Sequence, residues 1–325
     1  MVYCFCMKVL ITHSIPGNGV SLLRGHNIEV RVLEKKKVRK GDLIATLKKE
    51  AYDGMISLLT DTIDEEVLSA VGSQMKVIAN YAVGFNNIAV KKAKEQGIVV
   101  TNTPGVLTET VAEHTFALIL AVATRVVEAD AFVRAKQFTG WEPELLLGVD
   151  LLGKTLGIIG AGRIGSRVAE IGNAFGMEVV YHDMQKNKAL EEKIDAEYCG
   201  SPDEVLRRSA VVSVHLPLTD TTYHCIDAQK LSLMRSDAIL VNTSRGPVID
   251  EKALISTLRQ RKIFGAGLDV FEHEPAVPAA LRKLPNVVLT PHTASASIAT
   301  RGEMAKIAVE NVLAVLHGGK APNEV

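Results

Sequence analysis

The stretch TLGIIGAGRIGSRVAEIGNAFGMEVVYHD, residues 155–183, decides the fold of this chain. It consists of an apolar strand pattern, a Gly-Ala-Gly-Arg-Ile-Gly turn at 160–165, a helical pattern and a second strand pattern ending in Asp183. A lone G-x-G-x-x-G spacing is weak support for any function, but here it stands in the strand–turn–helix order that a dinucleotide-binding unit requires. The stretch therefore predicts a parallel α/β sheet with a dinucleotide site.

The glycines and the acidic residue of this stretch have separate predicted tasks. Gly160 allows the tight turn, Gly162 lets the backbone approach a pyrophosphate, and Gly165 lets the helix pack closely on the strand. The helix N-terminus offers unpaired N–H groups to the phosphates. Asp183, about 20 residues further on, would accept hydrogen bonds from the adenosine ribose and repel a 2′-phosphate, so we expect NAD rather than NADP.

Short apolar runs alternate with helical patterns over most of the chain. The runs are apolar on both faces, as strands buried in parallel sheets are. They form two sets, which predicts two doubly wound α/β domains with parallel sheets. The first set is 8–12, 54–59, 76–80 and 97–101, and the second is 155–160, 178–183, 211–216, 238–243, 265–270 and 287–292.

Two long helical patterns lie outside these sets. Residues 113–136 contain no Pro or Gly and are placed to join the two domains as one helix. Residues 297–319 follow the last strand pattern and end in Gly318-Gly319, a typical helix stop.

The composition is that of a globular protein and excludes several classes. Lys+Arg and Asp+Glu each count 37, so the net charge of zero lacks the basic excess typical of nucleic-acid binders. No run of about 18 apolar residues indicates a membrane span. Few, scattered cysteines without metal-type histidine spacing predict reduced thiols, no metal and a cytoplasmic location, with Cys4-x-Cys6 a weak metal or redox hint. The cysteines are Cys4, Cys6, Cys199 and Cys225.

Polar segments follow three of the late apolar runs. They are NTSRG at 242–246, DVFEHEP at 269–275 and TPH at 290–292. Open α/β sheets bind their ligands at the carboxyl ends of their strands, so these segments are the candidate active site.

Arg245, Glu274 and His292 in these segments suit the reduction of a 2-keto acid. Arg245 can fork onto the substrate carboxylate or polarise its carbonyl. His292 can donate a proton to the oxygen as a hydride reaches the carbon. Glu274 beside His292 would orient the ring and favour its protonated form. Any one of these residues alone is more often a surface or helix-cap residue, but their shared position after strands favours a catalytic set.

The chain resembles the D-isomer-specific 2-hydroxyacid dehydrogenase family over nearly its full length. The resemblance implies two Rossmann-like domains with a cleft between them. It also implies that an NAD-binding domain, 109–292, is inserted in a flavodoxin-like substrate-binding domain, 1–108 and 293–325. The matching segments are NYAVGFNNI (80–88), VTNTPGVLTETVAEHTFALIL (100–120), GKTLGIIGAGRIG (153–165), HLPLT (215–219), VNTSRGPVIDEKAL (241–254), GAGLDVFEHEP (265–275) and LPNVVLTPHTASAS (284–297).

The resemblance also implies residue roles. Arg245 binds the substrate, Glu274 orients the histidine and His292 is the acid/base. The Val83-Gly84 loop holds the substrate carboxylate, since a glycine loop can aim successive N–H groups at an anion, although a plain strand–helix turn is the alternative. Beyond the glycine turn and Asp183, the implied cofactor contacts are Arg163, Ile164, His215, Pro217, Thr243, Ser244, Arg245, Asp269 and His292.

Within the family, the chain is most similar to glyoxylate/hydroxypyruvate reductases, from SLLTDTID (57–64), NYAVGFNNI and TNTPGVLT. The resemblance therefore implies NADH-dependent reduction of a small 2-keto acid such as glyoxylate or hydroxypyruvate. Some glyoxylate reductases that take NADP carry Ser or Arg after the second nucleotide strand, where this chain has Asp183. A homodimer is expected, in which Trp141 either packs in the interface or reaches the neighbouring active site. The alternatives are a short D-3-phosphoglycerate dehydrogenase and an NAD-sensing co-repressor without turnover.

Overall fold

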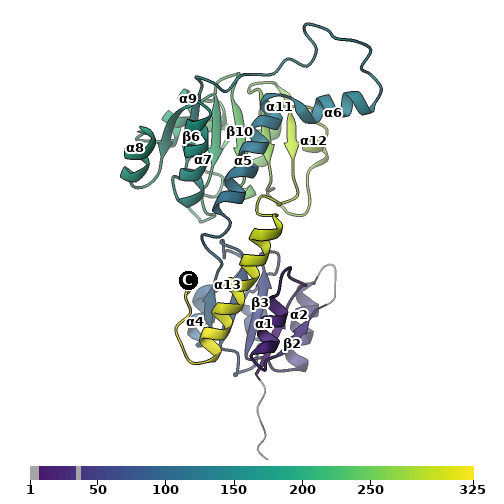
Figure 1. Ribbon diagram of the computed structural model, residues 1–325, viewed down its shortest axis with the longest axis vertical. Coiled ribbons are helices and arrows are strands. Elements are labelled where there is room, and N and C mark those ends of the chain that lie inside the picture. Colours follow the sequence, from purple (N-terminus) through teal and green to yellow (C-terminus); the bar gives the residue numbers. More distant parts are fainter. Residues whose placement is uncertain (1–6, 34–37) are drawn as a thin grey trace, which may run out of the picture. The chain divides into compact units, whose positions relative to one another are not determined.

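The computed structural model describes residues 7–33 and 38–325, so Cys4 and Cys6 lie outside the described residues. The chain divides into two compact units (Figure 1). Unit 1 comprises the residues up to Leu107 together with Ala296–Val325, and unit 2 comprises Thr108–Ser295.

Unit 1 contains a five-stranded parallel sheet in the order β2-β1-β3-β4-β5. This order is typical of flavodoxin-like doubly wound folds. The strands are β1 (Lys8–Ile11), β2 (Glu29–Val32), β3 (Gly54–Leu58), β4 (Val77–Tyr81) and β5 (Val99–Thr101). The helices are α1 (Gly19–Gly25), α2 (Lys40–Lys49), α3 (Glu65–Leu68), α4 (Val90–Glu95) and α13 (Ile298–Leu316).

Unit 2 contains a seven-stranded parallel sheet in the order β12-β11-β10-β9-β6-β7-β8. The strands are β6 (Thr155–Ile159), β7 (Glu178–His182), β8 (Glu197–Tyr198), β9 (Val211–Val214), β10 (Ile239–Asn242), β11 (Gly265–Leu268) and β12 (Val287–Leu289). The helices are α5 (Thr108–Ala123), α6 (Val126–Arg134), α7 (Arg163–Ala174), α8 (Lys188–Ile194), α9 (Pro202–Arg208), α10 (Ala228–Leu231), the 3₁₀ helix η1 (Gly246–Val248), α11 (Glu251–Arg259) and α12 (Ala279–Arg282).

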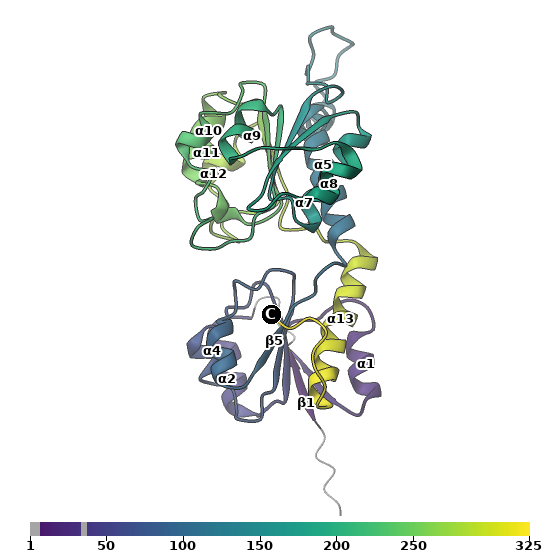
Figure 2. The ribbon, with the colours of Figure 1, turned by 90° about the vertical axis from the view of Figure 1, so that its left-hand side faces the viewer.

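Helices cover both faces of each sheet (Figure 2). In unit 2, α5, α7 and α8 lie on one face and α9 to α12 on the other. In unit 1, α1 and α13 cover one face, and α2 and α4 the other. The central strands β4, β9, β10 and β11 are buried along their whole length, as their apolar sequences require. The predicted fold class, two parallel α/β domains, is confirmed.

The prediction of a single helix over 113–136 is wrong. The backbone leaves the helical path between α5 and α6, where Arg125 has a φ of +55°. The Val149 N–H donates to the Ala123 carbonyl oxygen at 2.9 Å, so that oxygen is bonded to a segment that follows α6 instead of to a further turn of the helix. The helix is therefore interrupted without Pro or Gly, and α5 packs inside unit 2, against α7, β10 and β11. The short strands β2 and β8 were not among the predicted runs.

The C-terminal segment belongs to the sheet of unit 1. The side chain of Ser297 accepts a hydrogen bond from the Thr300 N–H and begins α13, and Gly318, with φ of +80°, follows its end. The buried Asn311 side chain donates to the Asn102 carbonyl and accepts from the Asn323 N–H. These contacts hold the end of the chain beside β5.

Two cysteines lie in the described part, and both are free thiols. Cys199 is buried, and burial raises the pKa of its thiol to about 11. Burial also raises the pKa of Cys225. Both thiols are therefore protonated near neutral pH and poor nucleophiles. Among the described residues, no helix is long and apolar enough to cross a bilayer.

Candidate active site

The predicted site residues of unit 2 gather where its strands end. All its strands are parallel, so their carboxyl ends lie at one edge of the sheet. The strand order reverses between β6 and β9, which is the position where doubly wound sheets bind ligands. The residues at this edge are Gly160 after β6, Asp183 after β7, His215 after β9, Thr243 after β10, Asp269 after β11 and Thr290 after β12.

The glycine turn has the geometry that its predicted tasks demand. Gly160 has φ of +97°, and a Cβ there would lie 2.7 Å from the His215 carbonyl oxygen. A Cβ on Gly165 would lie 2.0 Å from the Gly160 oxygen, so α7 packs directly on the turn. By contrast, a Cβ on Gly162 would meet no protein atom within 4 Å. Close packing thus requires glycine at positions 160 and 165, whereas Gly162 leaves open space beside the turn.

The backbone around Gly162 presents N–H groups to that space. Gly162 is the N-cap of α7 and has no side chain to cap the first N–H groups, which include those of Arg163 and Ile164. The Ala161 carbonyl accepts from the Ser166 hydroxyl and the Asn187 amide, at 2.9 Å each. Because a trans peptide points its N–H opposite to its C=O, the Gly162 N–H faces away from those side chains. This arrangement fits a pyrophosphate.

Asp183 is tied to the same turn. One carboxylate oxygen accepts from the Ala161 N–H at 2.8 Å, and the other accepts from the Met184 N–H at 2.6 Å. Each carboxylate oxygen can accept more than one hydrogen bond. Asp183 is half-buried, so it is held in one orientation while remaining able to bind a hydroxyl pair.

The structure brings Arg245, Glu274 and His292 together. The His292 Nδ1 lies 2.9 Å from the Glu274 Oε2, and the second Glu274 oxygen accepts from the Phe271 N–H at 3.1 Å. Burial lowers the pKa of Arg245, and the negative charge of Glu274 partly offsets this. An arginine remains protonated under all ordinary conditions, so the site holds one fixed cation, one carboxylate and one imidazole.

The buried Asn242 shapes the turn that carries Arg245. Its amide oxygen accepts from the N–H and the hydroxyl of Ser244, at 3.0 and 2.8 Å, and its NH₂ donates to the Arg245 carbonyl at 2.9 Å. At the next residue, a Cβ on Gly246 would lie 2.0 Å from the Phe271 backbone. The absence of that side chain lets the Arg245 turn approach the loop that carries Glu274.

Two further predicted cofactor residues have defined partners. The His215 Nε2 lies 2.8 Å from the Ser213 hydroxyl, and burial lowers the pKa of His215 to about 3, so its ring is neutral. The Thr243 hydroxyl lies 2.9 Å from that of Thr115 on α5. Pro217 follows in the same loop as His215 and is exposed.

Asp269 is fully buried at the end of β11. Burial alone would raise the pKa of this carboxyl, but contacts from His114, Thr290 and the backbone N–H groups of Thr293 and Ala294 outweigh it and lower the pKa. A charged carboxylate is therefore fixed behind the turn that carries His292.

Val83 and Gly84 lie in unit 1, directly after β4. The Asn102 amide donates to the Val83 carbonyl and the Asn80 amide to the Gly84 carbonyl, at 2.8 Å each. The N–H groups of Gly84 and Phe85, on the opposite sides of those peptides, have no hydrogen-bond partner in the described part of the chain. Two adjacent donors are thus held pointing away from the asparagines.

Sequence reasoning assigned no role to the residues that orient this machinery, although some of them stand in the segments quoted above. Asn242, Asn80 and Asn102 are buried polar residues at strand ends, and that position was their only available signal. Asn187 and His114 are contributed by other parts of the chain, and only the folded structure reveals their contacts.

A family model described as the NAD binding domain of D-isomer specific 2-hydroxyacid dehydrogenases matches residues 116–294. The glyoxylate reductase of Aeropyrum pernix is 48% identical to the chain, over 98% of the chain and 95% of that protein. This chain belongs to the D-isomer-specific 2-hydroxyacid dehydrogenase family. A glyoxylate reductase of Korarchaeum cryptofilum is 47% identical over the same shares of the two chains. The predicted family is confirmed, and so is the predicted enzyme class, a D-2-hydroxyacid dehydrogenase with a nicotinamide cofactor; the choice of NAD over NADP stays a prediction.

Solved structures agree with this membership. A Thermus thermophilus protein has a TM-score of 0.92 at 45% identity, covering 98% of this chain and 100% of that one. A D-lactate dehydrogenase from Aquifex aeolicus, complexed with NAD and lactic acid, scores 0.83 at 34% identity, covering 95% and 96%. An NADPH-dependent glyoxylate/hydroxypyruvate reductase from Sinorhizobium meliloti, in complex with NADP and malonate, scores 0.85 at 31%, covering 98% and 96%. Similar chains thus use either nicotinamide cofactor.

The glycine turn offers a matched pair of substitutions. Gly162→Ala should leave the thermal midpoint nearly unchanged but weaken NADH binding by about tenfold or more, because the new methyl group enters the open space. Gly165→Ala should destabilise the protein by about 1–3 kcal/mol, because it clashes with the Gly160 carbonyl. Fluorescence titration with NADH and thermal unfolding measure the two effects. Unchanged NADH affinity in Gly162→Ala would contradict the prediction that the cofactor binds at this turn.

Proposed function

We propose that this chain reduces small 2-keto acids, glyoxylate and hydroxypyruvate foremost, to the corresponding D-2-hydroxy acids with NADH. The observation that carries the proposal is the contact of 2.9 Å between His292 and Glu274, with Arg245 in the same site. Two similar proteins are named glyoxylate reductases, which favours these substrates over 3-phosphoglycerate.

In the proposed mechanism, each residue of the set has one task. When bound, the reduced nicotinamide supplies the hydride that the carbonyl carbon accepts. Arg245 binds the carboxylate or polarises the carbonyl through its planar, positively charged guanidinium group. It can do so at any pH, because its charge does not change with pH. His292 donates a proton to the carbonyl oxygen as negative charge develops there, and takes one back in the reverse reaction. Glu274 accepts from Nδ1, which leaves Nε2 of His292 to carry the transferred proton.

Unit 2 is proposed as the cofactor-binding domain. Gly160, Gly162 and Gly165 form the pyrophosphate turn, with the N–H groups of Arg163 and Ile164 as donors. Asp183 would accept from the ribose hydroxyls, and a 2′-phosphate would meet its negative charge. The remaining proposed cofactor contacts are His215, Pro217, Thr243, Ser244, Arg245, Asp269 and His292.

Unit 1 is proposed as the substrate-binding domain through its Val83-Gly84 turn. The N–H groups of Gly84 and Phe85, aimed away from Asn80 and Asn102, are two adjacent backbone donors, which suits a carboxylate. Backbone donors recognise the carboxylate common to all 2-keto acids and leave the substrate side chain to other residues.

We also propose that the chain forms a homodimer through α6 and the loop after it, 135–150, which Figure 1 shows extending from unit 2. None of the residues of α6 is buried, although the helix contains the apolar residues Val126, Val127 and Val133. Phe138 and Trp141 are 57% and 83% exposed. Such an apolar surface is typical of an interface between subunits.

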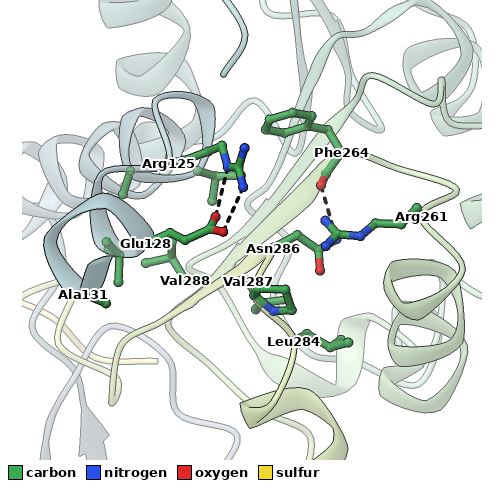
Figure 3. A pocket seen from close by; sticks show the side chains of 13 residues that line it. Arg125, Glu128, Ala131, Arg261, Phe264, Leu284, Asn286, Val287 and Val288 are labelled. Carbon is green, nitrogen blue, oxygen red and sulfur yellow. Dashed lines mark hydrogen bonds and ion pairs between the residues drawn. The ribbon is translucent and has the colours of Figure 1, made fainter. Parts of the chain in front are cut away.

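A pocket of about 580 Å³ lies beside this surface (Figure 3). It is lined by α5 and α6 and by the segment around β12, and it contains none of the predicted catalytic or cofactor residues. Arg125 and Glu128 pair across its wall through two hydrogen bonds. We assign the pocket to the proposed interface, where a second copy would fill it.

A substrate panel with both cofactors tests the activity and the task of Asp183. We expect turnover of glyoxylate and hydroxypyruvate with NADH at roughly 1–10³ s⁻¹. NADPH should be poorer by at least about tenfold in kcat/KM, because its 2′-phosphate faces the Asp183 carboxylate. Equal use of the two cofactors would contradict the task given to Asp183. NADH binding without turnover would instead support the NAD-sensing co-repressor alternative. A preference for 3-phosphoglycerate-type substrates would support the D-3-phosphoglycerate dehydrogenase alternative.

The catalytic set is tested by His292→Asn and Arg245→Ala. Each should lower kcat/KM by about 10²–10⁴, because proton donation or carbonyl polarisation is lost. Steady-state kinetics with glyoxylate and NADH measure the effect, and Leu152→Ala, an exposed change before β6 at the opposite edge of the sheet, is the control. Near-normal activity of either variant would rule out the role assigned to that residue.

Glu274→Gln should lower kcat/KM for reduction by about 10- to 100-fold, because a neutral amide places no negative charge beside the proton donor and can turn its NH₂ group toward the ring instead of an oxygen. Steady-state kinetics with glyoxylate and NADH measure the effect on the residue that lies 2.9 Å from His292. Wild-type kcat/KM would leave Glu274 with a structural task only.

The homodimer is tested by sedimentation velocity. The wild type should sediment as twice 35.1 kDa, and Val133→Asp should shift it toward the monomer. Met184→Asp adds the same charge at another exposed apolar residue and should leave the dimer intact. Trp141→Ala then separates two roles: dissociation indicates interface packing, whereas lost activity in an intact dimer indicates contact with the neighbouring site. A monomeric wild type would contradict the proposal.

A further inference from the structure

The buried carboxylate of Asp269 fixes the backbone on both sides of His292. The Asp269 carbonyl accepts from the His292 N–H at 2.8 Å. Its carboxylate accepts from the next two N–H groups, those of Thr293 and Ala294, at 2.8 Å each. One residue therefore accepts three consecutive N–H groups, beginning with that of His292 itself.

This hold matters because His292 has an unfavourable backbone conformation. Its φ is +54°, in the left-handed region that side chains other than glycine rarely adopt. Such a conformation persists only where surrounding contacts over-determine it. The direction of the imidazole, and hence its contact with Glu274, depends on the turn that Asp269 holds.

The Asp269 carboxylate is itself held by a relay from α5. The Thr290 hydroxyl lies 2.6 Å from the Asp269 Oδ1 and 3.1 Å from the His114 Nε2. A hydroxyl has one hydrogen, and the carboxylate has none to give. Thr290 must therefore donate to Asp269 and accept from His114, so the His114 Nε2 carries a proton. His114 also lies 3.6 Å from the same carboxylate oxygen.

We propose that His114 and Thr290 are positioning residues for His292, acting through the Asp269 carboxylate. The inference rests on the proposed role of His292 as acid/base. His114 orients the Thr290 hydroxyl, Thr290 completes the set of donors on Asp269, and Asp269 sets the turn that presents the imidazole to Glu274. Neither His114 nor Thr290 needs to touch the substrate.

Charged and titratable groups lie on both sides of the turn that carries His292, so a pH profile of the reaction is sensitive to how that turn is held. Glu274 contacts the His292 ring, and Arg245 lies close enough to Glu274 for their charges to interact. On the other side of the turn, His114 on α5 faces Asp269. Loosening the turn would weaken the contact between His292 and Glu274, so the pH dependence of the reaction should change together with its rate.

Substitutions at Thr290 test the proposal with closely matched chemistry. Thr290→Val keeps the shape and removes the hydroxyl, whereas Thr290→Ser keeps the hydroxyl. We expect Thr290→Val to lower kcat for glyoxylate reduction by about 10- to 100-fold, because a small displacement of a reacting group has effects of this size. The pH dependence of its kcat should also differ from that of the wild type. Thr290→Ser should restore both quantities.

Two more variants extend the test along the helix. His114→Leu should reproduce the Thr290→Val effects, and His114→Gln, which keeps an N–H donor, should restore part of the activity. Thr124→Val is the control, because the Thr124 hydroxyl, just after α5, donates to the Leu120 carbonyl in the last turn of that helix and lies outside the relay. Circular dichroism and thermal unfolding confirm that each variant is folded before kinetics are measured.

A double-variant cycle shows whether Thr290 acts through His292. In the His292→Asn background, Thr290→Val should lower the residual activity no further. An equal loss in both backgrounds would overturn the proposal, and so would a Thr290→Val enzyme with the wild-type kcat and pH profile. If His292→Asn itself is nearly as active as the wild type, the proposed function fails first. If only the Thr290 and His114 variants are wild-type-like, the catalytic set stands and this inference alone is wrong.

Discussion

The common direction of the strands in unit 2 is the constraint on which the site depends. Parallel strands place their carboxyl ends at one edge, so every loop after a strand begins beside its neighbours' loops. Residues more than a hundred positions apart, such as Gly160 and His292, thus belong to one edge of the sheet without any local sequence signal joining them. The chemistry needs a turn, a cation, a carboxylate and an imidazole, and four strands supply one each.

A second layer of polar contacts makes those loops rigid. Buried side-chain amides of Asn80, Asn102 and Asn242 bind backbone carbonyls in both units, which fixes the peptide planes and therefore the N–H groups on their opposite sides. Asp269 does the same with backbone donors. Buried polar groups are costly unless they are paired, so a loop held this way has few alternative conformations.

How far the sequence predicts this arrangement differs from residue to residue. Arg245, Glu274 and His292 could be proposed as a set because each follows an apolar run and because the surrounding segments resemble a known family. The break between α5 and α6 could not be predicted, because Arg125 carries no sequence mark of a left-handed backbone. The hydrogen bond at the break comes from Val149, which is distant in the sequence. His114 was read only as part of a helical pattern, since its partner Thr290 lies across the domain and its contact is purely tertiary. The edge strands β2 and β8 are short and partly exposed, so their apolar signal is weak.

The attachment of α13 to unit 1 has a consequence for the order in which the protein can fold. Unit 2 is one continuous stretch, so all its contacts are available once residue 295 has left the ribosome. Unit 1 is discontinuous, and α13, which covers one face of its sheet together with α1, is synthesised only after the whole of unit 2. During synthesis, the apolar face of β3, β4 and β5 that α13 covers therefore remains exposed while unit 2 is made. Domains usually complete in chain order, from the N-terminus onward. In this chain unit 2 can be completed before unit 1. The incomplete unit 1 is therefore the species that a chaperone would bind during synthesis.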